Sequence, residues 1–262
     1  MPWRRVGQRY PRLRSFLSRR LDSDEALGLN FTLSLLLAFL ALSLFALLAY
    51  SVYSAVSLNE PNELTGYDAR LSSELKAHAA RTPTLKALFL FITDLGDTIT
   101  LATLSTVVVL VLLIVMLRTR RHYLLGAFWI IATVGEGLLN LFLKDVCQRP
   151  RPTGGELHPG GWSFPSGHSM GSFVVYGMLA YLLMLAVRRW WVRAAIVGGL
   201  SLLVLAIGFS RAYLGAHWPS DVVGGFAAGA VWLALCITAA EALRRRGPAG
   251  DPGASRPAVP AD

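Results

Sequence analysis

Long apolar segments alternate with short polar ones along most of the chain. Each is close to the roughly 20 residues that a helix needs to cross the hydrocarbon core of a bilayer. Each is also apolar nearly all round, and none shows the period-two alternation of a membrane β-strand. The pattern predicts an all-α, polytopic membrane protein, a bundle of six transmembrane helices at Leu29–Val56, Thr98–Leu117, Tyr123–Leu143, Ser169–Val187, Val192–Phe209 and Val222–Ala240.

Composition supports a membrane protein. Of the 262 residues, 54% are hydrophobic and 16% are charged, whereas soluble domains carry about 25% charged residues. Six buried helices of a soluble protein are the alternative, but the runs are long and almost free of charge. The chain is predicted to divide into a basic cytoplasmic segment (1–28), a six-helix membrane domain (29–240) and a disordered, Gly/Pro/Ala-rich cytoplasmic tail (241–262).

The basic residues predict the orientation of the bundle. Six spans place both ends of the chain on one side, which receives 17 of the 25 Lys and Arg residues, while the other side receives 8. The positive-inside rule then puts both termini in the cytoplasm. A multi-pass protein of the cell (inner) membrane is expected. The net charge of +9 is explained by this bias, so no nucleic-acid partner is predicted.

One segment on the predicted outer side, residues 57–86, lacks a membrane span. It mixes charges of both signs with apolar residues at helical spacing, namely Leu71, Leu75 and Ala79. An interfacial helix lying along the lipid headgroups is one interpretation. A loop that only connects two spans is the other.

Three polar clusters interrupt the apolar segments, and the predicted topology places all of them on the outer side. They are Lys144–Pro152, Pro165–His168 and Ser210–Asp221. Because they are far apart in sequence yet share one membrane face, we expect them to form one site.

The cations of these clusters and the start of the fourth helix suit the binding of a tetrahedral anion. Lys144, Arg151 and Arg211 are cations, and Arg binds two oxygens of such an anion at once while Lys acts as a point charge. Ser166 and Gly167 stand where the fourth helix begins, and a helix N-terminus offers free N–H groups and a positive dipole end. These five residues are predicted to bind phosphate.

Two imidazoles and a carboxylate supply the second chemistry. His217 and Asp221 are four residues apart, one helical turn. A carboxylate that holds one ring nitrogen fixes the tautomer and makes the other nitrogen a better nucleophile. His168 is suited to protonate a leaving oxygen. No HExxH motif or EF-hand loop is present, and no acidic cluster resembles a magnesium site, so neither a metal nor a cofactor is predicted.

Glu136 and Asn140 lie eight and four residues before Lys144, so one helix stripe runs from the membrane interior to the site. An intramembrane carboxylate suggests a function by default. A possible substrate groove or gate is one interpretation of this stripe. Hydrogen bonding between helices is the other.

At these residues the chain resembles the type-two phosphatidic acid phosphatase superfamily, whose signature is KxxxxxxRP, PSGH and SRxxxxxHxxxD. Every defined position matches, from Lys144 to Asp221. The resemblance implies a helical bundle that hydrolyses phosphomonoesters or diphosphates without metal. It also implies that His217 forms a phosphohistidine, Asp221 orients it, and His168 protonates the leaving alkoxide and then activates water. Soluble vanadate-dependent haloperoxidases share the signature, but six membrane spans argue against that class.

Membrane members of this family act on lipid phosphates, so phosphatidic acid, phosphatidylglycerol phosphate and undecaprenyl diphosphate are the expected substrates. Membrane lipids are the other expected partners. A phosphotransferase that uses the same phosphohistidine remains an alternative, as does a non-catalytic protein that binds or transports phosphorylated lipid. The sequence does not predict the oligomeric state.

Overall fold

The computed structural model describes residues 29–119, 123–157 and 160–245. These residues form helices joined by loops, with no strand among them, which confirms the all-α prediction. The predicted segment 1–28 and residues 246–262 of the predicted tail lie outside the described residues. The helices are α3 (Leu29–Leu58), α4 (Glu63–Arg81), α5 (Pro83–Asp94), α6 (Thr98–Thr119), α7 (Tyr123–Cys147), α8 (Gly167–Ala186), α9 (Trp190–Tyr213) and α10 (Pro219–Arg245).

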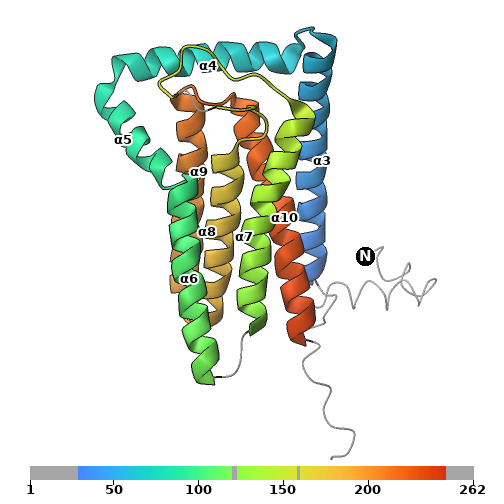
Figure 1. Cartoon of the computed structure of the whole chain (residues 1–262), viewed down its shortest axis with the longest axis vertical. Helices are drawn as coiled ribbons and strands as arrows, with labels where there is room; N and C mark the ends of the chain where they lie inside the picture. The colour runs from blue at the N-terminus through green and yellow to red at the C-terminus, as the bar shows by residue number, and fades with distance from the viewer. Residues whose placement is uncertain (1–28, 120–122, 158–159, 246–262) are drawn as a thin grey trace, which may run out of the picture.

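Six of these helices are long and apolar enough to cross a membrane, counted over the described residues, and they are the six predicted ones. They run side by side in one bundle (Figure 1). Helix α8 is the most buried of the six and packs against α7, α9 and α10. Side chains on α3 such as Leu37, Phe39 and Leu47 are more than 60% exposed. An apolar surface of this size suits contact with lipid, not water.

Helix α8 packs closely against α10 because it presents a glycine at the contact. A Cβ atom added at Gly177 would lie 2.4 Å from the Leu233 side chain of α10. Small residues at such a contact let two membrane helices approach closely. The central position of α8 fixes where its first turn, with the PSGH motif, meets the other helices.

Most of the segment 57–86 is helical, with α4 at its centre, so the connecting-loop interpretation is wrong. Asn62 caps α4 and forms a capping box with Thr65. Asp68, Ser72 and Ala79 are the buried residues of this helix, and α4 crosses one end of the bundle (Figure 1). We call this end the α4 end. Helix α5, which was not predicted, begins at Pro83, a residue favoured in the first turn.

Several spans extend beyond their apolar runs at the α4 end. Helix α7 continues to Cys147, α9 continues to Tyr213, and α8 begins at Gly167. These extensions carry the polar clusters on helix ends. At the opposite end, α10 ends at Arg245 and not at Ala240, so residues 241–245 are helical and not part of the tail. Glu241 accepts a hydrogen bond from the Tyr181 hydroxyl at 2.6 Å, which holds this last turn against α8.

Candidate active site

A cavity of about 530 Å³ lies at the α4 end and extends along the bundle. The side chains that line its polar part come from all three predicted clusters: Lys144, Arg151, His168, Arg211 and His217. The cavity therefore brings together residues that the sequence separates by up to 73 positions. Gly167 lines it too, whereas Ser166 and Asp221 lie behind its wall.

The chain between α7 and α8 positions Arg151. Helix α7 is ended by Gln148, which adopts a left-handed conformation (φ 44°) and donates its N–H to the Lys144 carbonyl. Beyond this turn, Arg151 donates from Nη1 to the Ala216 carbonyl at 2.9 Å and from Nε to the Gly161 carbonyl at 3.0 Å. The same Nη1 lies 3.0 Å from His217 Nε2. The guanidinium is therefore fixed beside the imidazole.

Lys144 reaches the same region from the last turns of α7. Its Nζ donates to the Trp162 carbonyl at 2.7 Å and lies 3.4 Å from the Ser163 carbonyl. Both acceptors are neutral, so within the described chain no carboxylate pairs with this ammonium group. Its charge is available for an anion in the cavity.

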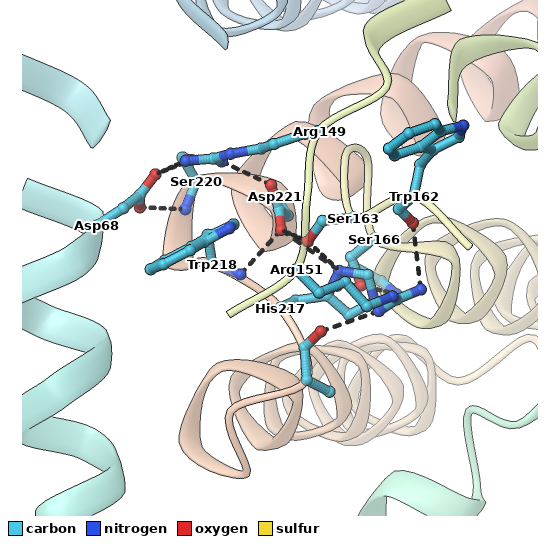
Figure 2. Close-up of polar contacts among 12 residues, drawn as sticks. Asp68, Arg149, Arg151, Trp162, Ser163, Ser166, His217, Trp218, Ser220 and Asp221 are labelled. Atoms are coloured by element: carbon cyan, nitrogen blue, oxygen red, sulfur yellow. Dashed lines mark hydrogen bonds and ion pairs between the residues drawn. The ribbon is translucent and has the colours of Figure 1, made fainter. Parts of the chain in front are cut away.

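His217 is buried in the turn between α9 and α10, with 2% of its surface exposed. Its Nδ1 lies 3.4 Å from Asp221 Oδ2 and 3.4 Å from Ser163 Oγ. Asp221 Oδ2 also accepts hydrogen bonds from Ser163 Oγ and from the Trp218 N–H (Figure 2). The carboxylate thus holds the Nδ1 side of the ring, and Nε2 faces the cavity.

Burial sets the protonation state of His217. Loss of hydration lowers its pKa to about 4, with Arg151 and Lys144 acting in the same direction and Asp221 opposing them. The imidazole is therefore neutral near physiological pH, and a neutral imidazole has a lone pair for nucleophilic attack. An Nδ1–H that donates to Asp221 leaves this lone pair on Nε2.

A second layer of charge, which the sequence analysis missed, holds Asp221 in place. Arg149 donates from Nη1 to Asp221 Oδ1 and from Nη2 to Asp68 Oδ2, each at 2.7 Å. Ser220 joins this network through hydrogen bonds to Asp68 and Arg149 (Figure 2). Arg149 is 4% exposed and Asp68 is fully buried, so α4 is tied to the site. The only signal in the sequence was an arginine two residues before Arg151.

Arg211 and His168 complete the wall of the cavity. Arg211 donates from Nη1 to Thr93 Oγ1 at 2.8 Å, and its buried Nε has no hydrogen-bond partner among the described residues. His168 Nε2 lies 3.9 Å from Asp97 Oδ1, and its side chain is 20% exposed. Both residues therefore have nitrogens that are free to bind a ligand. Thr93 is a further residue that the sequence analysis did not place in the site.

The PSGH motif begins α8 as predicted, and its serine is the N-cap of the helix. The Ser166 hydroxyl accepts hydrogen bonds from the Ser169 N–H and hydroxyl at 3.4 and 3.0 Å, so it caps the helix. Ser166 is fully buried. Gly167 is the first residue of α8 and lines the cavity. First-turn amides have no acceptor within the helix, so the backbone here offers donors to an anion.

Below the charged groups the cavity becomes a groove between α6 and α7. Glu136 and Asn140 line it. Apolar residues of α7 also line it, and they are more than half exposed on the outside of the bundle: Val134, Leu138 and Leu141. The groove therefore reaches the lipid-facing surface. One space joins a cationic end to an apolar lateral opening.

Together these features define a polytopic helical membrane protein with cations and two imidazoles gathered at one end of its bundle. Residues 123–245 match the sequence profile of the PAP2 superfamily, so the chain contains a PAP2 superfamily domain. This is the family that the signature resembles, and the match confirms that resemblance.

Individual relatives agree with this family. Phosphatidylglycerophosphatase B of Bacillus subtilis (strain 168) is 35% identical over 126 residues, which are 46% of this chain and 60% of that protein. A lipid A 1-phosphatase of Rhizobium johnstonii is 33% identical over 42% of this chain and 46% of its own length. The chain thus spans less than two thirds of the curated relatives it matches.

A solved structure extends the likeness beyond the matched domain. The crystal structure of a transmembrane PAP2 type phosphatidylglycerolphosphate phosphatase from Bacillus subtilis superimposes with a TM-score of 0.66 and 26% sequence identity. The superposition covers 79% of this chain and 98% of that one. The six-span bundle is therefore similar to that of a transmembrane protein.

Proposed function

We propose that this protein is an integral-membrane lipid-phosphate phosphatase, which hydrolyses phosphomonoester or diphosphate lipids through a phosphohistidine. One observation carries the proposal: the cavity joins a cationic, imidazole-containing end to a groove that opens sideways between α6 and α7. A lipid phosphate has matching parts, a charged headgroup and an apolar tail. The relatives, a phosphatidylglycerophosphatase and two lipid A phosphatases, support the same class.

In the proposed complex the phosphate lies among Lys144, Arg151 and Arg211, three cations that form no ion pair with a carboxylate among the described residues. Hydrogen bonds between ionised partners are the strong ones, and Arg matches two phosphate oxygens at once. The amides at Gly167 add neutral donors at the positive end of the α8 dipole. Such preorganised donors stabilise the charge that develops on the phosphoryl oxygens.

In the first proposed step, His217 Nε2 attacks phosphorus. A nitrogen–phosphorus bond forms, the bond between phosphorus and the lipid oxygen breaks, and His168, which the negative charge of the bound phosphate keeps protonated, gives its proton to that oxygen. The lipid alcohol leaves, and the phosphohistidine remains. Asp221 holds the Nδ1–H of the ring during this step, and it stabilises the positive charge that develops there.

In the second step, His168 takes a proton from water, and the hydroxyl attacks phosphorus. The nitrogen–phosphorus bond breaks, inorganic phosphate forms, and His217 regains its neutral ring. All charge stabilisation in this sequence comes from protein cations and amides. We therefore expect hydrolysis to persist in excess EDTA, and loss of activity on chelation contradicts this mechanism.

The proposed substrates are phosphatidic acid, phosphatidylglycerol phosphate and undecaprenyl diphosphate. The proposed location is the cell (inner) membrane, with both termini in the cytoplasm and the α4 end outside, because 17 of 25 basic residues then lie on the cytoplasmic side. A carboxy-terminal fluorescent-protein fusion checks the orientation. Fluorescence is expected, because such a fusion fluoresces when the terminus that carries it lies in the cytoplasm. A full-length fusion that does not fluoresce overturns the proposed orientation.

The decisive test is phosphate release by the purified protein, with the three lipids offered in turn. His217→Ala should abolish release while lipid binding to vesicles persists. With substrate labelled at phosphorus, an acid-labile, base-stable phosphoprotein should appear in wild type and be absent from His217→Ala. Transfer of label to an added lipid or sugar alcohol instead of water identifies a phosphotransferase. Binding without turnover in wild type identifies a lipid-binding or transport protein.

A further inference from the structure

Two polar side chains line the groove well below the cations of the site. Glu136 is 8% exposed and Asn140 is 7% exposed, and both border the cavity. They lie on α7, on the same helix stripe as Lys144. With a rise of 1.5 Å per residue, Asn140 is about 6 Å and Glu136 about 12 Å further along the helix axis than Lys144. They are therefore removed from the reacting phosphorus.

Neither side chain has a strong polar partner in the protein. Within the described residues, Glu136 makes no hydrogen bond or ion pair, and Asn140 donates only to the Met170 sulfur at 3.6 Å. A thioether sulfur is a weak acceptor. Unpaired polar groups at this depth are costly. Their remaining hydrogen-bonding capacity is directed toward the groove.

Contact between helices does not explain Glu136. The residue of α8 that it approaches is Gly171, where an added Cβ atom would lie 3.5 Å from Glu136 Oε2. Gly171 thus makes room for the carboxyl group but has no side chain to bind it. The interpretation of this stripe as a hydrogen bond between helices is therefore not supported by any contact of Glu136.

The depth of the two side chains matches one part of a lipid. In a glycerolipid the glycerol and its ester linkages follow directly below the phosphate, before the hydrocarbon begins. In a polyprenyl phosphate the hydrocarbon begins at the carbon bonded to the phosphate oxygen. Only the glycerolipid therefore brings carbonyl oxygens to the level of these residues.

We propose that Glu136 and Asn140 bind the ester oxygens of a glycerolipid phosphate and so select glycerolipids over polyprenyl phosphates. This specificity rests on the proposed phosphatase function. The Asn140 amide has two N–H donors, and a carboxyl group donates when it is protonated. A polyprenyl substrate leaves both groups buried and unpaired. Sites built to hydrogen-bond a substrate discriminate strongly against analogues that lack the matching group.

The test compares kcat/KM for three monophosphates: dioleoyl phosphatidic acid, its dialkyl ether analogue with the same chains, and undecaprenyl phosphate. The ether analogue keeps the shape of the substrate but lacks both carbonyls. Wild type should prefer the diacyl lipid over each of the others by about tenfold or more. Glu136→Leu and Asn140→Leu should bring both kcat/KM ratios close to one, mainly by slowing hydrolysis of the diacyl lipid.

Two variants control for folding and for general effects on the groove. Glu136→Gln keeps a hydrogen-bonding amide and should retain the ester preference. Thr133→Val changes another residue of the groove whose hydroxyl already donates to the Trp129 carbonyl of its own helix, so the ratios should not move. Equal rates of wild type on diacyl and dialkyl lipids overturn the inference while leaving the phosphatase intact. So does equal slowing of all three substrates in the leucine variants. No hydrolysis of any lipid by wild type removes the proposed function itself.

Discussion

Asp68 of α4 and Asp221 of α10 bind the same guanidinium, that of Arg149, at 2.7 Å each. The two carboxylates are 153 positions apart in the sequence. Because Asp221 also faces His217 Nδ1, a chain of contacts runs from α4 to the proposed nucleophile. The helix across the end of the bundle therefore contributes to the geometry of the site and does more than connect two spans.

Asp68→Asn tests this connection. The side chains of Asp68 and Arg149 are 1% and 4% exposed, and removing one partner of a buried pair costs about 3–5 kcal/mol. We expect a lower unfolding temperature in detergent and a kcat reduced about tenfold, because a displaced Arg149 disturbs Asp221. KM should change little, since the cavity cations are untouched. Glu74→Gln, an exposed change on the same helix, is the matched control. A kcat that stays at the wild-type value contradicts the connection.

Because its pKa is lowered, the His217 imidazole of the substrate-free protein should still react with an electrophile at acidic pH. Diethyl pyrocarbonate modifies neutral imidazole, so a free histidine with a pKa near 6.5 reacts about tenfold more slowly at about pH 5.5 than at about pH 7.5. With its pKa lowered to about 4 by burial, His217 should react at nearly the same rate at both pH values. Mass spectrometry of the His217 peptide, with N-acetylhistidine as the reference in the same tube, measures this. If His217 also reacts about tenfold more slowly at the lower pH, its pKa is not lowered.

The membrane spans and the common end of the three clusters were predictable because they depend on local properties. A long apolar run identifies a span by itself, and the number of spans between two clusters decides whether they share a side. Helix α5 escaped prediction for the same reason, since its 12 residues are too few to cross a bilayer.

The residues that support the site from behind, such as Asp68 and Thr93, were not predictable. Only their burial in the folded protein distinguishes them from other polar residues of the same segments. Asp68 and Glu74 lie in the same polar segment, yet only Asp68 meets an arginine in the interior. Thr93 is likewise buried against Arg211 by the way α5 packs on α9.

Ser166 shows a related limit. The motif placed it correctly at the start of α8, but its hydroxyl caps the helix and does not face the cavity.

Thr93→Val tests how Arg211 is held. The Thr93 hydroxyl accepts from Arg211 Nη1 at 2.8 Å, and valine removes this acceptor while keeping the shape. Hydrogen bonds to charged groups contribute about 1.5–3 kcal/mol, so we expect KM for a lipid phosphate to rise about tenfold. Thr103→Val, at an exposed threonine whose hydroxyl donates to its own helix, is the control. The role assigned to Thr93 is wrong if the two variants have the same KM.

Filling the groove should separate binding of the tail from chemistry at the phosphate. Gly137 lines the groove, and an added Cβ atom there meets nothing within 4 Å, so the side chain of Gly137→Leu enters the groove without a clash at its first carbon. Gly126 of the same helix is equally free of neighbours and lies outside the cavity lining, which makes Gly126→Leu the matched control. Both changes replace glycine by a better helix former, so neither is expected to weaken α7.

If the lipid tail occupies this groove, Gly137→Leu should reduce kcat/KM on a long-chain phosphatidic acid at least tenfold. Overpacking of a filled site costs about 1–3 kcal/mol, which is the origin of this figure. Hydrolysis of a water-soluble short-chain phosphate should stay within about twofold of wild type, because the cations and imidazoles lie at the other end of the cavity. If kcat/KM falls equally on both substrates, the substitution has disturbed the catalytic end of the cavity and not the binding of the tail. Unchanged rates on both show that the tail binds elsewhere, and then the lateral opening between α6 and α7 is not the path of the substrate.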